Sequence, residues 1–223
     1  MLYRCYLKRF FDILLSALGI IILSWLFIIL AIIIKVTSKG PILFKQKRVG
    51  KDKTHFNILK FRTMRIDTPK DVPTHLLSNP EQYITFIGRI LRKTSLDELP
   101  QLFNIFIGDM AIVGPRPALW NQEDLIAERD KYHANSIRPG LTGLAQVSGR
   151  DELPIPIKAK YDGEYVKDIR WKNDFKIIFM TFRAVVKQDG VKEGRICDDK
   201  YNKNRGLLSN ISQEIASTKD GDN

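Results

Sequence analysis

The stretch ILLSALGIIILSWLFIILAIII, residues 13–34, decides how the rest of the chain is arranged. It contains no charged residue, and as a straight helix it would extend roughly 33 Å, enough to cross the hydrocarbon core of a bilayer. It is too long for the apolar part of a signal peptide and lacks a small-residue cleavage site. The sequence therefore predicts a membrane-embedded helix near the N-terminus.

Basic residues lie on both sides of this segment, and two membrane topologies remain open. The basic residues are Arg4, Lys8 and Arg9 before it, and Lys35, Lys39, Lys45, Lys47, Arg48, Lys51 and Lys53 after it. The positive-inside rule places both flanks in the cytosol, which a single crossing cannot satisfy. A re-entrant helix that bends near Ser24 would satisfy it, because a serine hydroxyl bonded to a backbone carbonyl can bend a helix. A plain span would have its C-terminal side in the cytosol.

The net charge and the cysteine content of the chain limit the kinds of partner and scaffold that are expected. The 223 residues carry a formal charge of +11, which implies an anionic partner: nucleic acid, a phospholipid surface or a phosphorylated substrate. No recognised nucleic-acid-binding module is present, so nucleic acid is not the expected partner. The only cysteines are Cys5 and Cys197, which argues against a disulfide scaffold, and no zinc-ligand spacing occurs.

The remaining elements are expected to be mostly helical. Residues 42–48 and 55–61 flank a turn at 50–52 and predict a β-hairpin. Residues 67–80 and 139–150 are expected to be loops. The expected helices cover residues 83–91, 99–107, 123–132, 156–167 and 174–187. The last of these is amphipathic, which fits either core packing or a helix lying in the membrane interface.

These expectations give an α-rich α+β fold for a monotopic membrane protein. It would combine an N-terminal re-entrant helix, a small β-hairpin and several amphipathic interfacial helices. Residues 1–39 would form the anchor, residues 40–195 a cytosolic domain at the membrane interface, and residues 196–223 a polar, flexible tail.

An adjacent acid pair, Asp97 and Glu98, lies in the segment RKTSLDELPQ at residues 92–101. Neighbouring helical residues are about 100° apart, so the two carboxylates cannot face each other across a cleft as in a glycosidase. A capping box with Ser95 at the N-cap and Glu98 at N3 would explain them structurally. However, Pro100 would then remove a helical hydrogen bond, which favours a helix that begins at Asp97.

In that arrangement the acids stand at the start of the helix, beside cations. One carboxylate would attack or hold a metal while the other assists, a combination that suits chemistry on a phosphate.

Five sequence blocks in this order resemble the monotopic phosphoglycosyl transferases, bacterial sugar transferases that start glycoconjugate assembly on a polyprenyl phosphate. The blocks are KFRTM at 60–64, SLDELPQ at 95–101, GDM at 108–110, VGPRP at 113–117 and RPGLTG at 138–143. The resemblance extends from Lys8 to Gly194, nearly the whole chain. With an anchor and a catalytic domain alone, the chain resembles the minimal members of the family.

The resemblance implies a two-step reaction with a UDP-sugar and Mg²⁺. Asp97 would attack the β-phosphorus, associate with the metal, release UMP and carry a covalent phosphosugar. Undecaprenyl phosphate would then accept the phosphosugar. Glu98 would act as a general base or position the nucleophile.

The resemblance also implies further site residues and a location. Arg92, Arg116 and Arg150 match phosphate-binding arginines of the family, and Lys60 or Arg62 would add a contact. The family's membrane helix typically breaks at Ser-Pro, where this chain has Ser24-Trp25. The expected location is the bacterial inner membrane, with the catalytic domain on the cytosolic face.

The membrane itself is an expected partner, and a homodimer is left open. The rival interpretations are a single-span membrane-tethered adaptor and a nucleic-acid-binding protein, neither of which needs Asp97. The sequence specifies neither the sugar nor the glycan.

Overall fold

The N-terminal apolar segment forms two helices joined by a bend. The computed structural model describes residues 2–69, 80–149 and 153–186. A short π-helix, η1 (Tyr3–Leu7), leads into α1 (Lys8–Ile22), and α2 (Ser24–Thr37) follows. Leu23 leaves helical geometry between them, with φ −93° and ψ 7°, and the two helical segments are bent by 62°. In the described part of the chain no single helix is long and apolar enough to cross a membrane. The bent pair meets those criteria only when its halves are taken together.

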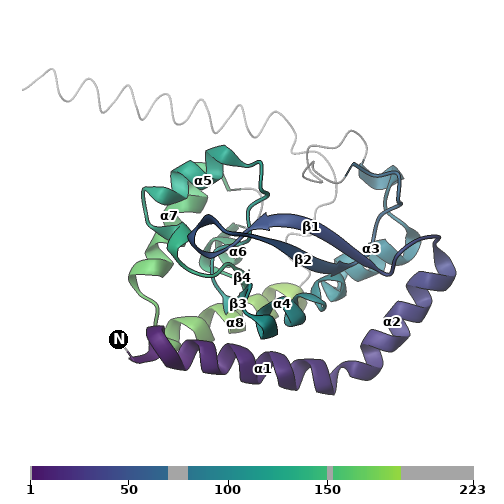
Figure 1. Ribbon diagram of the computed structural model, residues 1–223, viewed down its shortest axis with the longest axis horizontal. Coiled ribbons are helices and arrows are strands. Elements are labelled where there is room, and N and C mark those ends of the chain that lie inside the picture. The colour runs from purple at the N-terminus through teal and green to yellow at the C-terminus, as the bar shows by residue number, and fades with distance from the viewer. Residues whose placement is uncertain (1, 70–79, 150–152, 187–223) are drawn as a thin grey trace, which may run out of the picture.

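The hairpin expected from the sequence is confirmed. Strands β1 (Leu43–Val49) and β2 (His55–Phe61) pair antiparallel, from Leu43 opposite Phe61 to Val49 opposite His55. The turn between them contains a short 3-10 helix, η2 (Lys51–Lys53). The hairpin lies over α1 and α2, as Figure 1 shows.

The five helices expected outside the apolar segment are present, with shifted ends. The helices that follow the hairpin are α3 (Phe86–Lys93), α4 (Gln101–Ile107), α5 (Glu123–Asp130), α6 (Leu144–Gly149), α7 (Ile155–Lys167) and α8 (Trp171–Val186). Short 3-10 helices are η4 (Pro80–Gln82), η5 (Leu96–Glu98) and η6 (Ala134–Ser136). The Thr85 side chain caps α3 by accepting the Gly88 N–H, and Gly108 ends α4 with φ 109°.

The expectation that residues 139–150 form a loop was wrong. Strand β4 (Gly140–Thr142) pairs parallel with β3 (Ala111–Val113), and α6 follows it. The pairing brings backbones unusually close, since a Cβ on Gly140 would lie 2.1 Å from the Gly114 nitrogen. Glycine is therefore required here by the approach of another backbone. The other expected loop and the tail fall largely or wholly outside the described residues.

The start of α1 is tied to the folded domain by polar side chains. Lys8 Nζ and Tyr3 Oη both donate to Asp174 Oδ2 at 2.7 Å. Arg9 donates to the carbonyl oxygens of Ile105 and Phe106, at 2.7 and 3.0 Å, where α4 ends. Such a contact satisfies carbonyls that a helix terminus leaves unpaired.

Buried apolar residues connect the bent pair to the rest of the molecule. One cluster joins α2, β2 and α3 through Leu30, Ile34, Phe61 and Leu91. Other clusters lie where β3 meets α7 and α8, and where β2 meets α4. The first and last of these set the position of β2, which carries Lys60.

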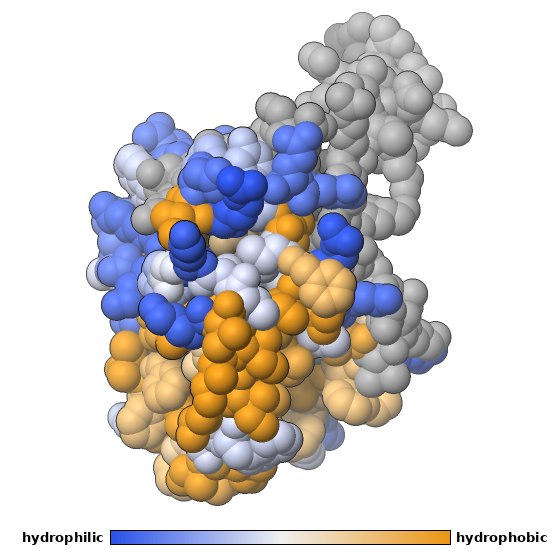
Figure 2. All heavy atoms as spheres, turned by 90° about the vertical axis from the view of Figure 1, so that its right-hand side faces the viewer, coloured by the Kyte–Doolittle hydropathy of each residue, from blue (hydrophilic) through white to orange (hydrophobic). Residues whose placement is uncertain are grey.

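Large apolar side chains also remain exposed. Figure 2 shows hydrophobic residues gathered over the lower part of the molecule and hydrophilic ones above. On α8 the side chains of Phe175, Phe179 and Phe182 are 67–69% exposed. Phe86 on α3 and Ile107 on α4 are also exposed. An apolar surface of this extent indicates a further binding surface for protein or membrane.

Candidate active site

The acid pair lies in a turn of its own between α3 and α4. Asp97 and Glu98 belong to the 3-10 helix η5, and α4 begins only at Gln101. Ser95 has a left-handed backbone, φ 58°, and its side chain makes no capping hydrogen bond. Neither the expected capping box nor the helix beginning at Asp97 is therefore formed. Pro100 immediately precedes α4, where its missing N–H breaks no helical hydrogen bond.

Glu98 is held by two cations. Lys60 Nζ from β2 donates to Glu98 Oε1 at 2.7 Å, and an Arg116 nitrogen lies 3.5 Å from the same oxygen. Burial alone would raise the pKa of Glu98, but Lys60 and Arg116 outweigh it and hold that pKa at about 2. Glu98 is consequently an ionised carboxylate at every physiological pH.

The pKa of Asp97 is shifted in the opposite direction, upward. Its side chain is buried, with 8% of the residue exposed. Burial raises the pKa of Asp97 to about 6 and the charge of Glu98 adds to the rise, while Lys60, Arg92 and Arg116 oppose it. Two adjacent carboxylates with widely separated pKa values are a frequent sign of divided chemical roles.

Polar residues not selected from the sequence fix the site. Arg92 Nε donates to Thr63 Oγ1 at 2.9 Å, which orients the guanidinium. The buried Asn104 of α4 accepts the Leu59 N–H at 2.9 Å and donates to the Asn57 carbonyl at 2.9 Å. These bonds tie α4 to β2 and so set the distance between the acid pair and Lys60. The sequence signal was an asparagine on an otherwise apolar helix face.

Gln101, the first residue of α4, is a further buried polar group beside the acid pair in sequence. It is 2% exposed, and its amide nitrogen has no hydrogen-bond partner among the described atoms. A buried donor left unsatisfied is costly, so a bound ligand is one way in which it would be completed.

The structure thus brings together five residues selected from the sequence: Asp97, Glu98, Lys60, Arg92 and Arg116. Arg62 points elsewhere. It is buried, and one of its terminal nitrogens donates to the Ser38 carbonyl and hydroxyl at 2.8 and 2.6 Å, at the end of α2. Ser24 is the first residue of α2, directly after the bend. Arg150 lies outside the described residues.

The acid pair offers one carboxylate to a metal. Asp97 takes part in no ion pair shorter than 4 Å with the described residues, whereas Glu98 pairs with Lys60 and Arg116. No group of three or more His, Cys, Asp or Glu side chains that would cage a metal occurs in the part of the chain described. Mg²⁺ is commonly held by one or two carboxylates together with substrate phosphates, so Asp97 and a diphosphate would fit it.

Comparison with known proteins identifies relatives over most of the chain. An exopolysaccharide production protein, ExoY of Sinorhizobium fredii, is 38% identical over 192 residues, covering 80% of this chain and 84% of that protein. The undecaprenyl-phosphate galactose phosphotransferase of Salmonella typhimurium is 38% identical over 200 residues, covering 83% of this chain but 41% of that protein. The UDP-glucose:undecaprenyl-phosphate glucose-1-phosphate transferase of Klebsiella pneumoniae is 38% identical over 181 residues, 78% of this chain and 39% of that protein.

The chain therefore spans most of the first relative and about two fifths of the other two. A family model described as bacterial sugar transferase matches residues 3–188. With that match and these identities, the chain belongs to the bacterial sugar transferase family, as its five motif blocks predict.

Proposed function

We propose that this transferase moves a sugar-1-phosphate from a UDP-sugar to undecaprenyl phosphate and releases UMP. The observation that carries the proposal is the acid pair, with Asp97 buried and its pKa raised while Glu98 is held ionised by Lys60 and Arg116. The names of the Salmonella and Klebsiella relatives support the lipid acceptor, and the Klebsiella name supports a UDP-sugar donor.

In the first step the diphosphate of the donor binds among Arg92, Arg116 and Lys60. The ionised carboxylate of Asp97 attacks the β-phosphorus, the bond from that phosphorus to the bridging oxygen breaks, and UMP leaves with the bridging oxygen. An aspartyl-phosphosugar remains on the enzyme. A bound Mg²⁺, held by Asp97 and the diphosphate, would offset the charge that develops on the leaving UMP.

In the second step a phosphate oxygen of the lipid attacks the phosphorus of the intermediate. The Asp97 carboxylate leaves, and a polyprenyl-diphospho-sugar is formed. Because the pKa of Glu98 is held at about 2, this carboxylate is a weak base at neutral pH. We therefore do not assign it the role of general base. Instead we assign it a role beyond positioning the nucleophile, in which it holds Lys60 and Arg116 in place for charge stabilisation.

The membrane arrangement in this proposal is a re-entrant helix at the cytosolic face of the bacterial inner membrane. It is supported by the 62° bend, by basic residues on both flanks and by the apolar lower surface in Figure 2. The exposed phenylalanines of α8 would lie in the interface as an amphipathic helix.

The chemistry is tested by UMP release. The full chain in detergent is supplied with a panel of UDP-sugars, undecaprenyl phosphate and Mg²⁺. We expect UMP from one or more sugars, none from Asp97→Asn, and undiminished release from Asp67→Asn, whose exposed carboxylate pairs with Arg65. Without the lipid, mass spectrometry should detect one phosphosugar on the wild-type chain. Full activity of Asp97→Asn would refute the nucleophile assignment.

The topology is tested by labelling from each side of the membrane. Cys5 is exposed and precedes the bend, and Lys39→Cys supplies a thiol after it. With Cys197→Ser in the background, both thiols are expected to react only from the cytosolic side. Reaction of Cys5 from the periplasmic side would establish a plain span instead.

A further inference from the structure

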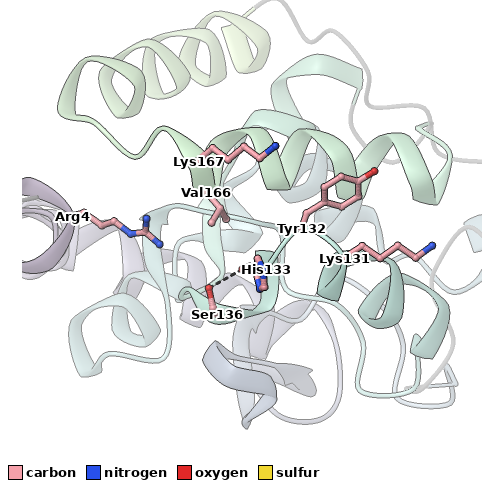
Figure 3. Close-up of a pocket in the computed structure, with 7 residues that line it drawn as sticks. All are labelled: Arg4, Lys131, Tyr132, His133, Ser136, Val166 and Lys167. Atoms are coloured by element: carbon pink, nitrogen blue, oxygen red, sulfur yellow. Dashed lines mark hydrogen bonds between the residues drawn. The ribbon is translucent and has the colours of Figure 1, made fainter.

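A basic hollow lies at the N-terminal end of the molecule, apart from the acid pair. Its volume is about 600 Å³, and it is lined by Arg4 of η1, residues 131–133, Ser136 of η6, and Val166 and Lys167 at the end of α7. Figure 3 shows the Arg4 guanidinium extending toward His133 and Ser136, with Val166 above them. None of the residues assigned to the transfer reaction lines it.

The charge of this hollow is not balanced by its own lining. Lys131 pairs with Glu128 at 2.6 Å. By contrast, neither Arg4 nor Lys167 has a carboxylate within 4 Å in the ranges that the structure describes, and no acidic residue is among the lining residues. The nearby Asp130 already pairs with Lys53 at 2.9 Å and accepts from Asn135 at 2.8 Å. The hollow therefore favours an anion.

Side chains suited to the membrane interface lie close in sequence to two residues that line the hollow, Arg4 and Lys167. Leu2 and Tyr6, each two residues from Arg4 in the sequence, are 66% and 72% exposed. Trp171, at the start of α8, is 55% exposed, and Lys172 Nζ stands 5.7 Å from its ring centroid. Tyrosine and tryptophan gather at the level of lipid headgroups, with Lys and Arg extending toward the aqueous side.

We propose that this hollow binds the phosphate of an anionic phospholipid headgroup. The planar guanidinium of Arg4 would contact two phosphate oxygens and Lys167 would add a second charge, while the acyl chains pass the exposed Tyr6 and Trp171. A bound headgroup would join η1 to the end of α7. The inference rests on the membrane location in the proposed function but not on the transfer chemistry.

Calorimetric titration of the full chain in a neutral detergent tests it. The probes are dihexanoyl-phosphatidylglycerol, dihexanoyl-phosphatidylcholine and inorganic phosphate. The test variant is Arg4→Gln with Lys167→Gln. The matched control is Lys45→Gln with Lys160→Gln, which removes the same charge from two exposed residues outside the lining. We expect saturable phosphatidylglycerol binding, weakened at least about tenfold in the test variant and unchanged in the control.

Three results would overturn the proposal: an unchanged Kd in the test variant, phosphatidylcholine binding as tightly as phosphatidylglycerol, or inorganic phosphate binding as tightly as the lipid. The last would indicate a site for free anions. The charge-preserving pair Arg4→Lys with Lys167→Arg should bind more tightly than the charge-removing pair, though less tightly than the wild type because a lysine at position 4 loses the two-oxygen contact, and this separates loss of charge from misfolding. Because no UDP-sugar is present, failure of the transfer chemistry would leave this result intact.

Discussion

Replacing Asp97 with Asn should stabilise the fold while abolishing transfer. Burial raises the pKa of Asp97 from an ordinary 3.8 to about 6, so the fold favours the neutral carboxyl. Each pKa unit corresponds to about 1.4 kcal/mol, and the shift of about two units thus gives about 3 kcal/mol. Only 8% of the residue is exposed, so solvent screens this cost little. Asparagine keeps nearly the same volume without the charge.

The stability gained by Asp97→Asn should increase as pH rises. A carboxyl whose pKa is higher in the folded state binds protons more tightly there, so its ionisation removes stability as pH rises from about 4 to about 6. The advantage of Asp97→Asn should be complete above about pH 6 and should vanish near about pH 4. The acid pair is thus a place where the fold gives up stability to bury the carboxylate that we propose as the nucleophile.

Chemical denaturation in detergent at about pH 7.5 and about pH 4.5 measures this difference. Asp67→Asn is the control, because it removes an exposed carboxylate whose ion pair with Arg65 lies in water. If Asp97→Asn gave no gain at the higher pH, or the same gain at both, the cost of burying this charge would be refuted. UMP release by the same preparations links the stability gain to the loss of function.

The remaining predictions concern the site and the core. The kcat/KM of UMP release should rise through about pH 6 as Asp97 loses its proton, and a profile without an ionisation in that range would contradict the assignment. Lys60→Met should lower the free energy of unfolding by about 1.5–3 kcal/mol and raise the pKa of Glu98, whereas Lys60→Arg should recover most of the loss in denaturation at neutral pH. Arg129→Met should lower the free energy of unfolding by about 3–5 kcal/mol, because it leaves Asp162 buried without its partner. The control Arg65→Met removes an exposed ion pair and should lower it by less than about 1 kcal/mol. Equal denaturation midpoints for these two variants would contradict the prediction.

Local patterns predicted the hairpin and the longer helices. Residues 42–61 carry two apolar-rich runs around Gly50, and α8 repeats phenylalanines at helical spacing. The parallel pair β3–β4 was missed because three-residue strands show no alternation. Its determinant is the contact between the backbones of Gly114 and Gly140, which lie far apart in the sequence. That information is tertiary, and the turn residues of this region alone suggest a loop.

In the candidate site, too, the sequence predicted which residues take part but not the backbone geometry and contacts that depend on the tertiary fold. The residue types and their order identified the acid pair, Lys60 and two of the arginines, which the fold gathers. The left-handed backbone of Ser95, which lies between α3 and η5, was not foreseen because a serine seldom adopts it. The partner of Arg62 was also unforeseen. Lys60 lies near the end of β2 and Arg62 directly follows that strand, yet Lys60 contacts Glu98 while Arg62 contacts Ser38.

The contacts at the two ends of the apolar segment support the proposed return of the chain to one side of the membrane. Lys8 and Arg9, which precede the segment, bind Asp174 and the end of α4. Ser38, which follows it, receives a hydrogen bond from Arg62 next to β2. A straight span would separate these ends by the thickness of the hydrocarbon core, roughly 30 Å, and would place one end away from the domain that both contact. Lys8 and Arg9, which precede the segment, therefore act as structural ties in addition to their proposed role in topology. Breaking one tie with Lys8→Met should loosen α1 from α8 while leaving the local geometry of Asp97 and Glu98 unchanged.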